Sequence, residues 1–322
     1  MSQRIASVIQ TPFPGCECIV REAFSKWQVP QSALTVMMSS LSANTKSQYS
    51  SSFKLWWQYC QEKVIDPYNV SIPSILDFIS VCFERGSSFG TLNNHRSALS
   101  LISRNKVGQD ERIKRFFKGA FKLKPSFPKY NTTWNPNRVL DFLSKKFPNE
   151  SLTLEDLGKK LVVLLALATG QRCQTLSLIR LSNINVRVDH IFINITDLIK
   201  TSTVNRRQPM LYIPFFNQRP SVCPAKALVD YIKLTSSKRY NSQDNLIISF
   251  RKPFQPVSSQ TIARWIKQTL SASGIDISVF SAHSTRHAST SAAHQAGVSV
   301  DTIRNTADWS ENSAVFARFY QR

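Results

Sequence analysis

Apolar residues recur every three to four positions along most of the chain, a spacing that predicts a mainly helical fold. The first clear stretch covers residues 42–63, with Ser42 or Asn44 as its N-cap. It carries Trp56 and Trp57, and their rings are able to stack on nucleic-acid bases. Tryptophan at helical spacing is more often part of the core, so we expect this helix to bury them.

Two more helices are predicted after it. Residues 74–86 follow a proline and end in a glycine, and residues 91–105 form the next periodic stretch. The second stretch carries His95, which we expect at the surface or partly buried. It also carries Arg96, a candidate contact to phosphate.

A fourth helix is strongly basic. Between Arg112 and Lys129 there are seven lysines and arginines and no acidic residue. Ile113, Phe117 and Phe121 form an apolar stripe, which leaves a cationic face for phosphate groups, because each cation releases counterions on binding. A solvated basic face is the alternative. The candidate DNA contacts on this helix are Arg112, Arg115, Lys118 and Lys122.

The spacing of prolines divides the chain. Residues 1–40 mix prolines and serines without a sustained period, and they predict an irregular N-terminal arm. Residues 123–136 contain three prolines and predict a linker between domains. We therefore expect a helical domain over residues 41–122 and a second domain over residues 137–322.

The second domain opens with helical patterns. One predicted helix is capped by Thr153, contains the apolar run Leu161–Ala168 and ends at Thr169-Gly170. Arg172 follows at once. A buried arginine needs a partner charge, and either a protein carboxylate or a substrate phosphate would supply it.

Residues 190–195 and 209–215 are rich in β-branched and aromatic residues and predict a hairpin with a long tip. The tip carries Lys200, Arg206 and Arg207, and the two arginines are candidate DNA-backbone contacts. The fold class is thus mainly α with a small antiparallel β-sheet (α+β).

Helices are also expected over residues 225–237 and 258–274, with a buried strand or short edge strand at residues 245–250 between them. Arg264 and Lys267 lie one turn apart on the second of these helices. They are candidates for the DNA major groove, where arginine recognises guanine, although a solvated face is equally compatible.

Charge points to the partner. The 322 residues carry a formal net charge of +21, so a polyanion is the first expectation. Residues 1–135 hold 17 Lys and Arg against 8 Asp and Glu, and the remainder holds 24 against 12. Both halves are therefore basic, as expected of a protein that holds double-stranded DNA from two sides. A basic surface that only maintains solubility is the alternative.

Six cysteines follow no metal-binding spacing, and no signal peptide or membrane-spanning run is evident. We expect a soluble, reduced, intracellular protein without a metal.

The last forty residues contain the most distinctive pattern. His283 and Arg286 form H-x-x-R, Trp309 follows 23 residues later, and Tyr320 a further 11. On a helix, the imidazole and the guanidinium lie one turn apart on the same face. A guanidinium matches two oxygens of a phosphate.

With Arg172 upstream, this order resembles the carboxy-terminal signature of the tyrosine recombinases, the phage-integrase family. The wording HSTRHASTSAAHQAG, with ATGQRCQTL upstream, is most similar to the recombinases of DIRS-type retroelements, with Crypton elements second. The resemblance covers residues 42–322. It implies a helical core-binding domain and a catalytic domain that close around DNA as a C-shaped clamp.

The resemblance also implies the chemistry. Tyr320 is the nucleophile that forms a 3′-phosphotyrosyl bond, Lys200 protonates the leaving 5′ oxygen, and His283 assists proton transfer. The implied catalytic set, which needs no metal or cofactor, is Arg172, Lys200, His283, Arg286, Trp309 and Tyr320.

Arg172 and Arg286 hold the non-bridging oxygens in this scheme. Trp309 stands where the family often has a second histidine, and its indole N–H is still able to donate to phosphate. Two features depart from the family pattern: Thr175 replaces an acid three residues after Arg172, and Trp309 is a little farther from Tyr320 than usual. Gln174 or Thr175 are the expected partners of Arg172.

The expected function is site-specific recombination that integrates or excises the DNA of a mobile element in the nucleus, by a homotetramer on two DNA sites. Only two residues follow Tyr320, so we expect either a truncated chain or assembly through another element, such as residues 1–40. A catalytically inactive DNA-binding relative and a type IB topoisomerase-like enzyme are the alternatives.

Overall fold

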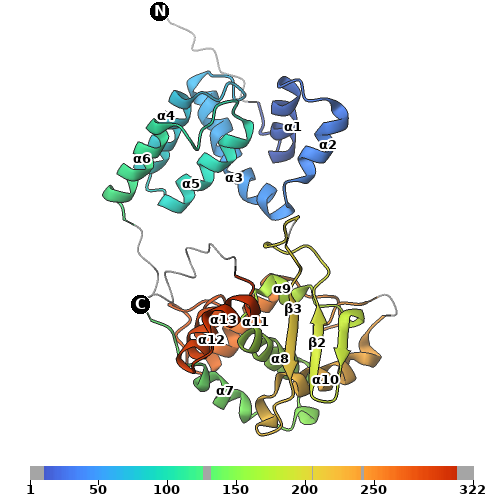
Figure 1. The fold of residues 1–322 in the computed structure, drawn as a ribbon. Coiled ribbons are helices and arrows are strands. Elements are labelled where there is room, and N and C mark those ends of the chain that lie inside the picture. Colours follow the sequence, from blue (N-terminus) through green and yellow to red (C-terminus); the bar gives the residue numbers. More distant parts are fainter. Residues whose placement is uncertain (1–10, 126–131, 205, 241–242, 310–322) are drawn as a thin grey trace, which may run out of the picture. The chain divides into compact units, whose positions relative to one another are not determined.

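The computed structural model describes residues 11–125, 132–204, 206–240 and 243–309. The chain divides into two compact units, residues 1–128 and 129–322 (Figure 1). The boundary lies inside the predicted linker. None of the helices in these described ranges is long and apolar enough to cross a membrane.

The first unit is helical throughout its described part (Figure 1). Apolar residues of all its helices meet in one core, in which Phe53 and Trp56 are fully buried. Ser42 caps α3, as predicted, by accepting a hydrogen bond from the backbone N–H of Thr45. The helices are α1 (Cys16–Lys26), α2 (Gln31–Ser39), α3 (Ala43–Lys63), α4 (Ile72–Glu84), α5 (Phe89–Ile102) and α6 (Glu111–Leu123).

The prediction of an irregular arm is wrong for residues 16–39. These residues form α1 and α2, and Ile19, Phe24 and Leu34 are buried in the core of the first unit. The helices are short and their apolar positions are few, so the periodicity was too brief to show in the sequence.

His95 is also placed differently from the prediction. Its ring is buried, and its Nδ1 lies 2.9 Å from the hydroxyl of Ser52 on α3. Burial lowers the pKa of His95, so the neutral ring joins α5 to α3.

The second unit places helices around a small sheet (Figure 1). The strands β1 (Ile184–Val186), β2 (His190–Asn194) and β3 (Met210–Pro214) pair in that order, all antiparallel. The helices are α7 (Pro136–Ser144), α8 (Leu154–Thr169), α9 (Cys173–Ser177), α10 (Pro224–Thr235), α11 (Ser259–Ala272), α12 (Ser284–Gln295) and α13 (Val300–Thr306). Short 3₁₀ turns lie at Asn149–Ser151, Leu181–Asn183, Pro220–Val222 and Ser236–Lys238.

The predicted hairpin is confirmed as β2 and β3, in which Ile191 pairs with Ile213. Strand β1 was not predicted. The strand predicted at residues 245–250 is wrong, since this segment makes only isolated bridges, at Asn245 and Ile248. Its apolar residues are buried under neighbouring helices, and burial of that kind does not require a strand.

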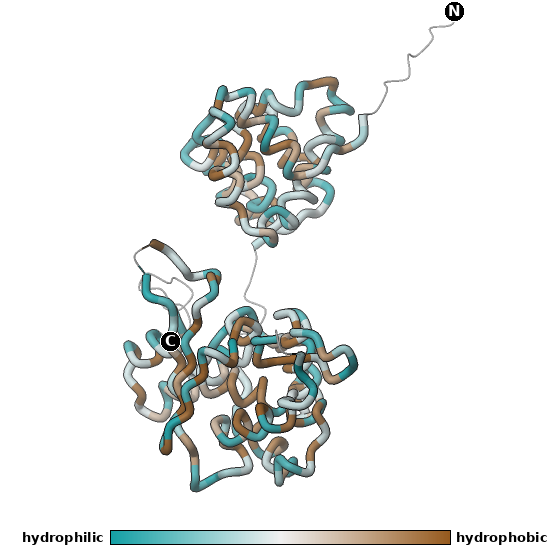
Figure 2. Tube along the Cα trace, turned by 90° about the vertical axis from the view of Figure 1, so that its right-hand side faces the viewer, coloured by the Kyte–Doolittle hydropathy of each residue, from teal (hydrophilic) through white to brown (hydrophobic). Residues whose placement is uncertain are grey.

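The predicted linker ends earlier than expected. Trp134 is buried in the core of the second unit, and its indole N–H donates to the hydroxyl of Ser284 at 2.9 Å. Apolar segments gather inside each unit (Figure 2). The fold is therefore mainly α with a small antiparallel sheet, as the sequence predicted.

Candidate active site

The turn between α8 and α9 brings Arg172 to the site. Gly170 ends α8 with φ 59°, and a Cβ built on it would lie 2.9 Å from the Cβ of Ala307. The side chain of Gln171 donates to the carbonyl of Thr306 at 2.9 Å. The end of α13 is thus packed on this turn, and a residue larger than glycine does not fit there.

A buried carboxylate meets Arg172. Nη1 of Arg172 lies 3.5 Å from Oδ2 of Asp308, whose side chain is 7% exposed. Burial lowers the pKa of Arg172, and the negative charge of Asp308 opposes this effect. The sequence prediction that Gln174 or Thr175 would be the partner of Arg172 is therefore wrong.

Asp308 also holds the loop between β2 and β3. Its Oδ1 accepts a hydrogen bond from Nη2 of Arg206 at 2.6 Å, and its Oδ2 accepts one from the hydroxyl of Thr201. Arg206 donates in addition to the carbonyl of Trp309 at 3.2 Å. Arg206 was predicted to contact the DNA backbone, but here its guanidinium is bound to protein.

Lys200 precedes Thr201 on the same loop. Its side chain is exposed, and its backbone N–H donates to the side-chain oxygen of Gln174 on α9 at 3.3 Å. The loop that carries the predicted general acid is therefore attached both to α9 and to Asp308.

The H-x-x-R pair lies at the start of α12. Arg286 is 1% exposed, and its guanidinium carbon lies 4.1 Å from the centre of the Trp309 ring. Trp309 is itself buried against Ile303 and Ala307. The structure thus gives Trp309 a clear role as the aromatic surface on which Arg286 lies.

Two histidines lie next to Arg286. The ring of His287 is 5.9 Å from that of His283 and 6.4 Å from that of Trp309. Burial lowers the pKa of His287 to about 4, with smaller contributions from His283 and Arg286. His287 was predicted to have a packing or surface role, and the structure buries it beside the motif residues.

His283 lies at the surface, yet the protein removes part of its hydration. Its pKa is lowered by this desolvation and by the positive charges of Arg286, Arg172 and Lys200. The electrostatic effect of these cations places all three within interaction range of one imidazole. At neutral pH this imidazole is uncharged and able to accept a proton.

Five of the six predicted catalytic residues are therefore brought together, and the sixth, Tyr320, lies outside the described residues. Asp308, Thr201 and Gln171 were missed. Their contacts join segments that are more than a hundred positions apart in the sequence. An aspartate directly before the motif tryptophan was the only available signal for them.

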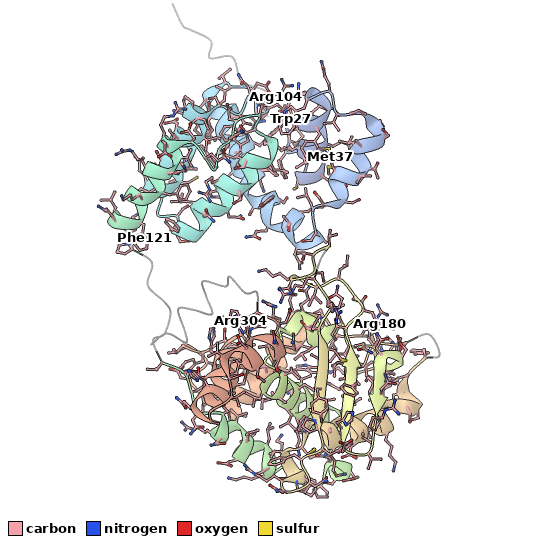
Figure 3. The ribbon with its side chains drawn as sticks, viewed as in Figure 1. Trp27, Met37, Arg104, Phe121, Arg180 and Arg304 are labelled. Carbon is pink, nitrogen blue, oxygen red and sulfur yellow. The ribbon has the colours of Figure 1, made fainter. Side chains whose placement is uncertain are left out.

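The predicted DNA contacts differ in what they touch. Arg96 lies over the ring of Phe117 at 4.8 Å, and Arg112 forms a salt bridge with Asp110 at 2.8 Å. Phe121, which was predicted in the apolar stripe of α6, is 45% exposed (Figure 3). The predicted contacts with exposed side chains are Arg112, Arg115, Lys118, Lys122, Arg207, Arg264 and Lys267.

With this geometry in place, comparison with known proteins identifies the family. The family model described as "Phage integrase family" matches residues 138–322. The chain belongs to the phage integrase family. The matched residues contain every predicted catalytic position of this chain, and family membership agrees with the resemblance seen in the motif.

Solved structures of integrases and recombinases share the fold. The XerH recombinase in a pre-cleavage complex with its difH substrate aligns with a TM-score of 0.59 and 14% identity, covering 97% of this chain and 96% of that chain. The integrase of transposon Tn1549, in complex with circular intermediate DNA, aligns at 0.55 and 13%, covering 94% of each chain.

A lambda integrase dimer bound to a COC′ core site aligns at 0.52 and 13%, covering 93% of this chain and 92% of that chain. At such identities the likeness concerns the fold. A search of curated proteins found no match.

Proposed function

We propose that this protein is a site-specific DNA recombinase that cleaves and rejoins DNA through a bond between Tyr320 and a 3′ phosphate. The observation that carries the proposal is the convergence of Arg172, Arg286 and Lys200 on the imidazole of His283. Three cations and one neutral imidazole form a site that favours a phosphodiester anion and is able to move a proton.

The cleavage step balances as follows. The phenolic oxygen of Tyr320 attacks the phosphorus, and its proton passes to the neutral ring of His283. The bond from phosphorus to the 5′ oxygen breaks, and the ammonium of Lys200 donates a proton to that oxygen. The product is a phosphotyrosyl ester and a free 5′ hydroxyl, so the energy of the phosphodiester is retained for rejoining.

The two arginines act on the transition state. Negative charge grows on the non-bridging oxygens as the tyrosine attacks, and Arg172 and Arg286 provide fixed donors for it. Loss of one donor of this kind costs on the order of 10²- to 10³-fold in rate. Burial of Arg286 under Trp309 strengthens the interaction, because charges attract more strongly away from water.

The first unit is proposed to hold the DNA backbone through α6. Arg115, Lys118 and Lys122 are exposed on this helix, whereas Ile113 and Phe117 are buried on its other side. Cations on one face of a helix neutralise successive phosphates. Further proposed DNA contacts are Arg96, Arg112, Arg207, Arg264 and Lys267.

We further propose that the DNA belongs to a mobile element of the DIRS type, and that a homotetramer acts on two sites in the nucleus. The wording around His283 and Arg172 supports the type of element. The net charge of +21 supports binding to duplex DNA. The proposed chemistry uses only side chains of this protein.

The test is a suicide-substrate assay with nicked DNA from the ends of the candidate element. Wild-type protein is expected to give a covalent adduct on a denaturing gel, and Tyr320→Phe is expected to give none. An adduct in both proteins would exclude Tyr320 as the nucleophile. DNA binding without any adduct would favour the inactive DNA-binding alternative, and relaxation of supercoils on DNA without paired sites would favour the topoisomerase alternative.

A further inference from the structure

We infer that Asp308 is a positioning residue, which holds the lysine-bearing loop between β2 and β3 against Arg172. The inference rests on the proposed function, because it assigns the reason why Lys200 stands near the other catalytic residues. Three contacts of one carboxylate carry it.

Both oxygens of the Asp308 carboxylate are in use. Oδ1 accepts from Arg206 at 2.6 Å, and Oδ2 accepts from Thr201 and lies 3.5 Å from Nη1 of Arg172. Thr201 and Arg206 belong to the loop, and Arg172 belongs to the start of α9. One buried side chain therefore joins the loop to the arginine that is proposed to hold the phosphate.

The backbone at Asp308 is fixed by its surroundings. Its φ of 54° lies in the left-handed region, which aspartate tolerates better than most residues. The preceding Ala307 packs on Gly170, and the N–H of Trp309 donates to the carbonyl of Arg304 at 3.0 Å. A fixed backbone gives the carboxylate a fixed position, from which it is able to orient a more exposed loop.

The charges explain why the contact matters. Arg172 and Arg206 repel each other, and this repulsion contributes to the lowered pKa of Arg172. Asp308 is the negative charge that lies between them. Without it, the repulsion moves the loop away from α9, and Lys200 moves with the adjacent Thr201.

The expected result is a loss of general-acid catalysis. A misplacement of about 1 Å costs on the order of 10²-fold in rate, so we expect Asp308→Ala to slow cleavage of ordinary DNA by about that factor. A substrate with sulfur in place of the bridging 5′ oxygen releases a thiolate, which is a weaker base and leaves without a proton. Asp308→Ala and Lys200→Ala are expected to cleave this substrate at nearly the wild-type rate.

Matched variants separate positioning from general damage. Arg172→Ala is expected to stay slow with both substrates, because the sulfur does not replace a phosphate contact. Asp301→Ala removes an exposed aspartate–arginine pair on α13 and is expected to match wild type. Asp308→Asn keeps the size of the side chain and serves if the alanine variant does not fold. Arg206→Ala removes the partner from the loop side, and its effect should not add to that of Asp308→Ala.

Hydrogen exchange of the loop amides tests the inference without catalysis. We expect faster exchange at residues 198–204 in Asp308→Ala than in wild type or Asp301→Ala. Unchanged exchange would overturn the positioning role, as would equal slowing of Asp308→Ala with the oxygen and sulfur substrates. Absence of a wild-type adduct, with faster loop exchange in the variant, would overturn the proposed function and leave Asp308 as the anchor of the loop.

Discussion

The contact between Arg286 and Trp309 gives a prediction whose size follows from the structure. The guanidinium carbon lies 4.1 Å from the ring centre, and both side chains are buried. A desolvated cation–π pair contributes about 2 kcal/mol, and the face of phenylalanine contributes less than that of tryptophan. The comparison of Trp309→Phe with Trp309→Leu therefore separates the aromatic face from the filled volume.

We expect Trp309→Leu to lose roughly 30-fold in cleavage rate, because about 2 kcal/mol corresponds to that factor at 1.36 kcal/mol per tenfold. Trp309→Phe should lose only about fivefold, since it retains roughly half of the attraction. The reason is that Arg286 must stay oriented while charge develops on the phosphate.

The assay is single-turnover formation of the covalent adduct at saturating DNA, with urea unfolding of each variant measured in parallel. The two substitutions remove similar parts of a buried side chain, so their costs in folding stability should be similar. Equal cleavage rates for the phenylalanine and leucine variants would refute the argument, and would show that the ring only fills space.

Two further predictions follow from the charges of the two units. The triple variant Arg115→Ala, Lys118→Ala, Lys122→Ala should reduce the slope of log affinity against log salt by about 2.7, at about 0.9 per phosphate lost; Lys54→Ala, an exposed change on α3, should alter that slope by less than one, and an unchanged slope in the triple variant would remove α6 from the DNA contacts. The lowered pKa of His283 means that its ring loses its proton below pH 6.5, so cleavage should fall only as the pH drops through a value below 6.5. A pH profile of adduct formation checks this: His283→Gln should abolish the acidic limb, and a limb centred above 6.5 would contradict the assignment.

Much of this architecture was predictable because its determinants are local. Ser42 and Thr153 cap their helices through a hydroxyl that accepts from a backbone N–H three residues later. The hairpin over β2 and β3 followed from alternation of apolar residues such as Ile191 and Ile193. In each case the pattern and its partner lie within a few residues.

The missed elements depend on distant partners. Helices α1 and α2 are stabilised by the core of the first unit rather than by a long periodic pattern. Trp134 is fixed by Ser284 from the other end of the second unit. No local pattern indicates such contacts, because tertiary packing decides them.

The candidate site shows the same division. The H-x-x-R motif, the upstream arginine and the tryptophan were recognisable by spacing alone, yet spacing did not indicate what holds them together. Asp308 and Trp309 are consecutive, and their side chains contact Arg172 and Arg286 respectively. The two arginines come from segments far apart in the chain, so the dipeptide Asp308-Trp309 is the shared support of both.

This arrangement makes one backbone position important to the whole site. The left-handed conformation at Asp308 gives consecutive side chains different directions, one toward the β2–β3 loop and one over Arg286. Packing of Ala307 on Gly170 fixes that position relative to α9. Since a Cβ at Gly170 would come within 2.9 Å of Ala307, even a methyl group there would shift the dipeptide and with it both arginine contacts. The geometry of the proposed phosphate site is therefore determined by the contact between α13 and the α8–α9 turn, as well as by the motif residues themselves.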